Sequence, residues 1–316
     1  MASDDLARRF LHVNLNCTSL DATEKLYAGA LGLSARMRTD PSVATNGAIL
    51  GIDDETYCET AFLYDSRGAR DGCALEAIEY QKPELLRDNR VEPTRPGIRS
   101  ALMWVADLDA AAAALRDAGA TVGDPVDGLI SGTKSVLAID GDGVIVELAQ
   151  APGDVDVSKG ALFGGIRIAA INAVATAEFL TAIGFVQVSA PTLMPVTGQQ
   201  LAPDATDEPV ECTVARFALP EDADRFTVSV VSHPATAGQD PVPWGGNRQG
   251  LYRCALRVES VEKALAATPG SVERCGDPVW CPLPGTKIDG LYIAFLRSPD
   301  GVVFEFVERP LKFFSR

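Results

Sequence analysis

The stretch GTKSVLAIDGDGVIVELAQAP, residues 132–152, returns near the end of the chain as GTKIDGLYIAFLRSPDGVVFEFVERP, residues 285–310. Both copies open on a GTK triplet and carry a glutamate near their end, Glu147 in the first and Glu305 in the second, and the second copy has five extra residues in its hairpin. Each copy has the pattern of a strand, a turn and a second strand. This repeat predicts a chain built from copies of one supersecondary unit.

Working outward from the repeat gives four such units. An alternating strand followed by a helical pattern precedes both copies, at 97–119 and 250–270, and the same pattern occurs at 10–33 and 166–185. Short β-rich runs follow each helix, so each unit has the order βαβββ. The units begin near residues 9, 97, 164 and 250.

Local signals place the first two helices. Ser19 or Asp21 is a candidate cap for the start of the first helix, and Asp107 or Asp109 for the second. Gly119 is expected to end the second helix, because glycine adopts the left-handed backbone of a helix end without strain.

Two irregular stretches interrupt the pattern. The segment QAPGDVDVSKGALF, residues 150–163, is rich in Pro, Gly, Ser and Asp, which is typical of a linker. It predicts an N-terminal domain of residues 1–154 and a C-terminal domain of residues 155–316. The stretch at 191–209 is polar and rich in proline, so a surface loop is expected there, and whether it acts as a lid is left open.

Composition limits the classes of function. The 316 residues are 47% hydrophobic and 22% charged, as in a globular protein, and 28 basic against 43 acidic residues give a net charge of −15. This charge disfavours binding to nucleic acid or anionic lipid. No apolar stretch has the length of a signal or a membrane span, so a cytoplasmic protein is expected. The seven cysteines contain no CxxC pair, which favours reduced thiols.

The four βαβββ units, the opening HVNLN…SLDATEKLYAGALGL and the two DGV…E endings together resemble the vicinal oxygen chelate superfamily. That superfamily includes glyoxalase I, bleomycin-resistance proteins, epimerases and extradiol dioxygenases. The resemblance implies an α+β fold with two glyoxalase-like cupped mixed sheets, one for each consecutive pair of units. It also implies that helices lie outside the cups.

In that superfamily a metal ion lies inside the cup, held by the first and last strands of paired units. The resemblance therefore implies three metal ligands here: His12 on the first strand of unit one, Glu76 on its last strand, and Glu147 on the last strand of unit two. Ser100 stands where a second histidine is common. One imidazole and two carboxylates suit a single divalent ion of Fe, Mn, Ni, Co or Zn.

The matching positions of the C-terminal half are Gly164 or Gly165, Ser229, Arg253 and Glu305, so the resemblance implies that this half is metal-free. Arg253 and Glu305 on facing strands would instead form a buried ion pair in the space of a metal.

Strand alternation supports the first group of ligands. A period of two places His12, Asn14 and Asn16 on one face of their strand, and Glu76 with Tyr80 on one face of theirs. Glu79 lies three residues after Glu76, and a register shift of one residue would turn it inward instead. The choice between the two glutamates is open at this point.

The resemblance implies a metal-dependent isomerase or epimerase that acts on a small oxygenated metabolite with vicinal oxygens, in the manner of enzymes of secondary metabolism. Glu76 is then either the third ligand or the general base, and Asn14, Tyr80, Ser100 and Trp104 line the substrate site. The only partner expected is this small-molecule substrate, and a homodimer is left open.

Two alternatives remain. One is an Fe(II)-dependent oxygenase or lyase that uses the same site. The other is a metal-free binding or self-resistance protein, in which Tyr80, Trp104 and Trp280 stack on an aromatic metabolite.

Overall fold

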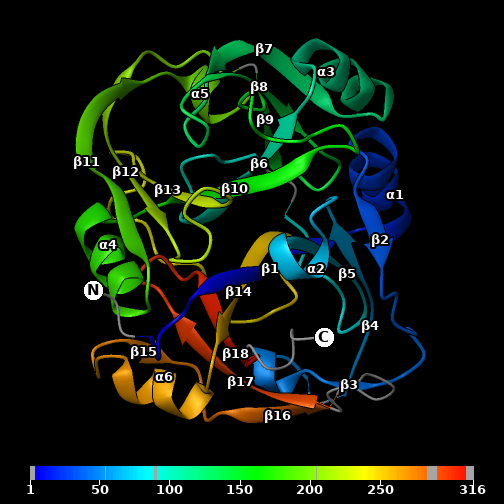
Figure 1. Ribbon diagram of the computed structural model, residues 1–316, viewed down its shortest axis with the longest axis vertical. Helices are drawn as coiled ribbons and strands as arrows, with labels where there is room; N and C mark the ends of the chain where they lie inside the picture. Colours follow the sequence, from blue (N-terminus) through cyan, green and yellow to red (C-terminus); the bar gives the residue numbers. More distant parts are fainter. Residues whose placement is uncertain (1–3, 54, 89–90, 204, 283–289, 311–316) are drawn as a thin grey trace.

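The computed structural model describes residues 4–53, 55–88, 91–203, 205–282 and 290–310, and its core consists of two curled mixed β-sheets with helices on the outside (Figure 1). The four units begin where the sequence predicts, at Arg9, Gly97, Leu162 and Gly250. The GTK triplet of the second repeat, at 285–287, lies outside the described residues. No described helix is long and apolar enough to span a membrane.

The first sheet has the strand order β15-β17-β18-β14-β1-β5-β4-β2 and combines the first and fourth units. Its strands are β1 (Arg9–Cys17), β2 (Ser34–Arg36), β4 (Glu55–Tyr64), β5 (Ala74–Lys82), β14 (Gly250–Val258), β15 (Glu273–Arg274), β17 (Gly290–Arg297) and β18 (Val303–Glu308), with β3 (Thr45–Asn46) paired to β4 and β16 (Val279–Pro282) paired to β17. We call its inner face the first cup.

The second sheet has the order β11-β12-β13-β10-β6-β9-β8-β7 and combines the second and third units. Its strands are β6 (Gly97–Val105), β7 (Thr121–Asp127), β8 (Lys134–Ile139), β9 (Ile145–Gln150), β10 (Leu162–Ala169), β11 (Val186–Val196), β12 (Val210–Ala218) and β13 (Thr227–Ser232). We call its inner face the second cup.

The pairing of units therefore differs from the predicted one, since units one and two lie in different sheets, and so do units three and four. β1 pairs with β14 and β6 pairs with β10, both antiparallel. The connection at 151–161 joins β9 to β10, which lie on either side of β6 and so roughly 10 Å apart. This short linker keeps units two and three in one sheet. Residue 155, the predicted domain boundary, therefore lies in a loop between two strands of the same sheet rather than between the two sheets.

The longer helices, at 20–30, 108–117, 173–182 and 261–267, pack on the outer faces of the sheets, and the first two begin at predicted caps. Asp107 caps α3 by accepting from Ala110 N at 2.9 Å, Ser19 caps α1, and Gly119 has a φ of 100° after α3. The helices are α1 (Leu20–Glu24), continued by the π-helix η1 (Lys25–Ala30), η2 (Ala48–Leu50), α2 (Gly68–Asp71), α3 (Leu108–Asp117), α4 (Ala173–Ala182), α5 (Gly198–Leu201) and α6 (Val261–Ala267).

The predicted loop at 191–209 is partly a strand. β11 continues to Val196 and pairs with β12, and α5 follows. Pro191 and Pro195 are compatible with this strand because β11 is the edge of its sheet, where an N–H facing away from the neighbour is not needed. Only the part after α5 remains irregular among the described residues.

Two repeated aspartates connect the sheets. Asp142, in the turn of the first repeat, accepts from Thr18 N at 2.9 Å, and Asp300, in the turn of the second, accepts from Ile171 N at 2.7 Å. Each bond joins one sheet to the other at the end of a first strand. The DG turns that mark the repeat therefore hold the two sheets together.

Candidate active site: an arginine between two glutamates

Strand register shows which residues are equivalent in the four units. In three units a glutamate on the last strand pairs with a first-strand residue: Glu76 with Asn14, Glu147 with Leu102, and Glu305 with Ala255. In the third unit the position of the glutamate is taken by Ser229, which pairs with Arg167. The residue two positions before the paired first-strand residue is also equivalent in the four units. It is His12 in the first unit, Ser100 in the second, Gly165 in the third and Arg253 in the fourth.

The first cup brings together His12, Glu76, Arg253 and Glu305. Arg253 Nη2 donates to Glu76 Oε2 at 2.6 Å, and Arg253 Nε lies 3.2 Å from Glu305 Oε2. His12 Nε2 lies 3.4 Å from Glu76 Oε2 and 4.0 Å from Glu305 Oε2. One guanidinium therefore occupies the centre of a group of two carboxylates and an imidazole.

Burial and the arginine charge set the protonation of this group. Burial lowers the pKa of His12 to about 4, so the imidazole is neutral at pH 7. Burial disfavours the charge of Glu76, but its contacts with His12 and Arg253 outweigh this, and the pKa of Glu76 is lowered. Burial raises the pKa of Glu305 to about 7, against the opposing effect of Arg253. The two carboxylates in turn raise the pKa of Arg253, which stays charged.

Neighbouring side chains fix this group in place. Phe62 packs edge-on against the His12 ring, with centroids 5.3 Å apart, and Asn14 Nδ2 donates to the backbone oxygen of Glu76. Tyr80 donates to Gly246 O at 3.2 Å. The four site side chains keep 7–13% of their exposure, so a few atoms of a ligand can reach them.

The remaining predicted residues lie on the other sheet. Ser100, Trp104 and Glu147 face the second cup, so the structure does not bring Glu147 to His12 and Glu76. Its carboxylate accepts instead from Ile130 N at 3.0 Å and Ser131 N at 2.8 Å. The predicted grouping of these three residues is wrong because units one and two belong to different sheets.

The second cup is filled by its own chain. The loop at 128–133 crosses it, and Ser229 Oγ donates to Leu129 O at 2.8 Å. Arg167 donates to Ser100 Oγ, Pro93 O and Leu201 O, and burial lowers its pKa to about 10. This cup offers a filled interior rather than a site.

Two further expectations concern side chains of the first sheet. Glu76, not Glu79, faces the site, because the carboxylate of Glu79 accepts from Leu20 N at 2.7 Å at the start of α1. Trp280 lies on β16 against Tyr292 and is 49% exposed, so it lines neither cup.

Solved structures match the whole chain. Glyoxalase I from Zea mays matches with a TM-score of 0.68 and 18% identity over 96% of this chain and 92% of that one. A candidate dioxygenase from Bacillus subtilis matches with a TM-score of 0.60 and 14% identity over 96% and 86%. The chain has the glyoxalase fold. This confirms the predicted α+β architecture of two cupped mixed sheets.

The likeness is one of fold, since no family model and no curated protein matches the sequence. The expected ion pair of Arg253 and Glu305 is present, but it lies in the same cup as His12 and Glu76 rather than in a separate one. The sequence did indicate Glu305 as a candidate, because the repeat aligns it with Glu147. The repeat does not indicate, however, which units share a sheet.

The first cup contains donors of the kind that bind a divalent ion. His12 Nε2 is buried with no hydrogen-bond partner among the described residues, and with two carboxylates it forms a suitable donor set. An ion bound to both carboxylates at about 2.1 Å would, however, meet Arg253, whose nitrogens already lie on the same oxygens. The residues present therefore do not fit the predicted metal in this arrangement.

Proposed function

We propose that the first cup is the active site of an isomerase or epimerase, which moves a proton on a small oxygenated metabolite with two adjacent oxygens. The observation that carries the proposal is the contact of Arg253 with both Glu76 and Glu305 on the inner face of the cup. The glyoxalase fold supports it by placing these groups inside a curved sheet. The metabolite itself stays unidentified.

The geometry gives each side chain a distinct part in proton transfer. Glu305 takes a proton from the carbon next to a carbonyl group, and the electron pair of the C–H bond moves to the carbonyl oxygen. Arg253 stabilises the negative charge that develops there. Glu305 then returns the proton to the neighbouring carbon while the hydroxyl proton moves to the other oxygen, which completes an isomerisation. Inversion of the same carbon requires instead that water delivers a proton from the opposite face, with Glu305 releasing its own proton to solvent. Glu76, at 2.6 Å from Arg253 Nη2, holds the guanidinium in position.

From the sequence, Glu76 was either the third metal ligand or the general base, and the contacts favour Glu305 as the base instead. Glu76 is the closer acceptor of Arg253 and is kept ionised by it, whereas Glu305 has a pKa raised to about 7. A base near the working pH exchanges its proton readily in both directions. His12, neutral and with its Nε2 unbonded among the described residues, is available to bind a substrate hydroxyl.

A hydrogen-exchange experiment tests this function. Chelator-treated protein is incubated in D2O with a panel of α-hydroxy ketones and α-hydroxy aldehydes, and NMR follows the C–H signal next to the carbonyl. We expect exchange with one or more members, and a loss of about 100-fold or more in rate in Glu305→Gln, since general-base catalysis contributes about 10²–10⁴.

Glu147→Gln is the matched control, because Glu147 has the equivalent strand position in the second cup. Its exchange rate should equal that of the unmodified protein. Binding of panel members without any exchange would contradict catalysis. It would support instead the alternative of a metal-free binding protein, for which Phe62 and Tyr80 supply aromatic surface beside the site.

A further inference from the structure

The first cup holds its positive charge on a side chain. We infer that Arg253 takes the place of a divalent cation, so that this cup acts on a carbonyl or enolate oxygen with a fixed guanidinium and excludes metal ions. The use of that charge rests on the proposed function, but the exclusion of metal does not. The inference concerns His12, Glu76, Arg253 and Glu305 together.

Strand register shows that Arg253 and His12 have equivalent positions in their units. Units one and four each give the cup one residue of a first strand and one glutamate of a last strand, His12 with Glu76 and Arg253 with Glu305. β1 and β14 are paired, so the two contributions meet at the centre of the sheet. Arg253 thus stands at the position equivalent to His12, and a histidine there would complete a set of four metal donors.

The charge of Arg253 opposes the binding of a metal ion to the same carboxylates. The guanidinium bridges the two carboxylates, with Nη2 at 2.6 Å from Glu76 Oε2 and Nε at 3.2 Å from Glu305 Oε2. A divalent ion on the same oxygens would lie beside this cation in a site of low exposure, where like charges repel strongly. The Arg253 side chain is 7% exposed, and moving it away from these oxygens would break both contacts. Metal and arginine are therefore alternatives.

The second cup shows that a buried arginine alone does not produce this arrangement. Arg167 stands two residues further along its strand, opposite Ser100 and Ser229, and its hydrogen bonds go to one hydroxyl and two backbone oxygens. Within the described part of the chain no carboxylate forms an ion pair with it. Arg253 differs because it lies between two carboxylates that would otherwise be metal ligands.

A cobalt titration tests the inference. CoCl2 is added to the unmodified protein and to Arg253→His, and both isothermal titration and the visible d–d spectrum are recorded. We expect no site in the unmodified protein and one equivalent of cobalt in Arg253→His, bound about 100-fold more tightly or better. The melting temperature of Arg253→His should rise with cobalt, because the ion binds only the folded state.

Two further variants separate the causes. Arg253→Met removes the cation without adding a donor, and it should bind cobalt more weakly than Arg253→His. Adding His12→Ala to Arg253→His should abolish the tight site, whereas adding Glu147→Gln should not. A folded Arg253→His, with a cooperative melt and unchanged circular dichroism, that binds no cobalt would overturn the inference.

The unmodified protein gives a test that does not depend on the folding of a variant. A stoichiometric cobalt site in it that disappears in His12→Ala would show that Arg253 does not exclude metal. Hydrogen exchange that requires added metal would also overturn this inference but would leave the proposed proton transfer intact. If no hydrogen exchange occurs but the cobalt titration gives the expected result, the proposed proton transfer is contradicted and the exclusion of metal by Arg253 stands.

Discussion

Glu147 and Glu305 occupy the same place in two copies of one motif but have different partners. Glu305 lies 3.2 Å from a guanidinium and is 7% exposed, whereas Glu147 is 1% exposed and accepts two backbone N–H groups of the loop at 128–133. The residue type is the same, and its neighbours decide whether it is available for chemistry or holds a loop.

Replacement of Glu147 tests the structural role. Glu147→Ala leaves Ile130 N and Ser131 N without their acceptor, and we expect a loss of about 2–4 kcal/mol in the free energy of unfolding. Urea unfolding measures it. Glu147→Gln keeps one oxygen acceptor and should lose clearly less. Equal losses in the two variants would mean that volume, not hydrogen bonding, explains the effect.

At the scale of elements, the linker between β9 and β10 is a packed segment. Ala161 N donates to Leu31 O at 2.8 Å, which attaches it to the end of η1. Gly160 has a φ of 118°, and a Cβ there would lie 2.8 Å from Gly32 O. The composition of this stretch predicts a linker correctly, but its glycine serves a close contact.

A pair of substitutions in this linker gives a matched comparison. Gly160→Ala should cost about 1–3 kcal/mol in the free energy of unfolding, because of the positive φ and the backbone contact. Gly153→Ala should change it little, since nothing lies within 4 Å of a Cβ at that position. Chemical denaturation of both variants checks this, and similar values for the two would count against a packed linker.

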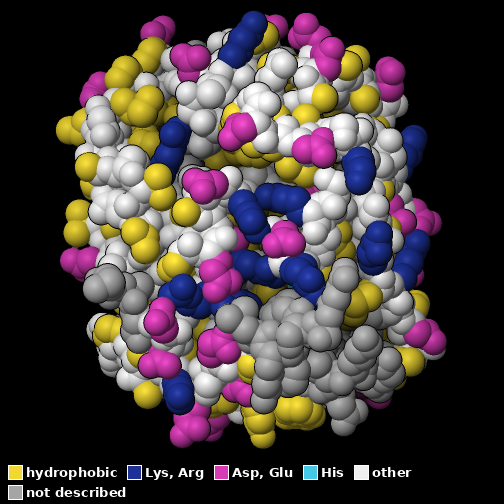
Figure 2. Space-filling model, viewed as in Figure 1, with side chains coloured by type: hydrophobic (Ala, Val, Ile, Leu, Met, Phe, Trp, Pro, Cys, Tyr) yellow, Lys and Arg dark blue, Asp and Glu magenta, His cyan; other side chains and the backbone are white. Residues whose placement is uncertain are grey.

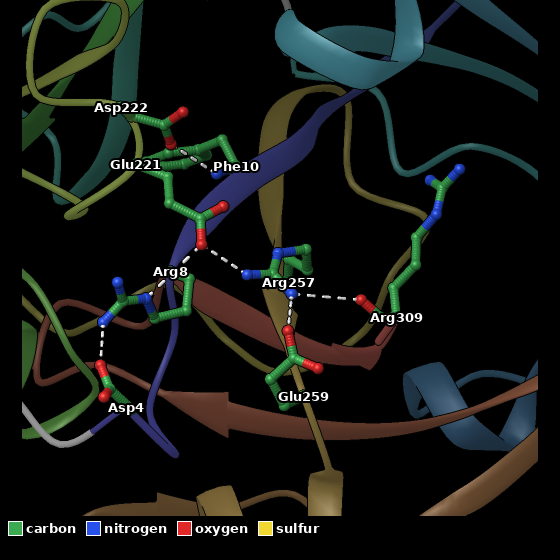
Figure 3. Close-up of polar contacts among 8 residues, drawn as sticks. All are labelled: Asp4, Arg8, Phe10, Glu221, Asp222, Arg257, Glu259 and Arg309. Carbon is green, nitrogen blue, oxygen red and sulfur yellow. Dashed lines mark hydrogen bonds and ion pairs between the residues drawn. The ribbon is translucent and has the colours of Figure 1, made fainter. Parts of the chain in front are cut away.

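At the scale of the molecule, charged side chains connect the two sheets, and we call the contacts of Glu221 and Asp222 with β1 and β14 the seam. Figure 2 shows Lys and Arg side chains gathered near the middle of one face, with acidic side chains among them. In Figure 3, Asp222 of the second sheet's unit accepts from Phe10 N at 2.6 Å, and Glu221 pairs with Arg257 of β14. The turn after β12 therefore binds both β1 and β14.

This seam gives the stability a pH dependence. Burial raises the pKa of Asp222 from its ordinary value of 3.8 to about 7. Between these pH values the folded state holds more protons than the unfolded state, so Asp222 contributes stability at low pH that is lost as pH rises through 7. Asp140 shifts in the same direction, and His12 in the opposite one.

Asp222→Asn isolates this contribution, since an asparagine oxygen can still accept from Phe10 N. The stability of the unmodified protein relative to the variant should fall by up to about 4 kcal/mol between pH 4 and pH 8. Urea unfolding at several pH values within this window measures it. Parallel pH profiles for the two proteins would rule out titration of Asp222 as the cause.

The sequence by itself determined the four βαβββ units, their starting residues and the common face of His12, Asn14 and Asn16. These features follow from local periodicity and capping, in which each residue depends on neighbours a few positions away. Glu76 was distinguishable from Glu79 only in the structure, where α1 binds the carboxylate of Glu79. Strand alternation alone allowed either.

Only the tertiary structure decided which units share a cup, and with that the composition of the site. β1 pairs with β14, more than 230 residues away in the sequence. Which strand pairs with the edge of a first strand depends on long-range contacts, among them those of the linker and of the turns between the sheets. This pairing separated Glu147 from His12 and brought Arg253 and Glu305 to it. Local pattern specifies a strand and its faces, whereas the choice of its neighbour depends on contacts that no local pattern contains.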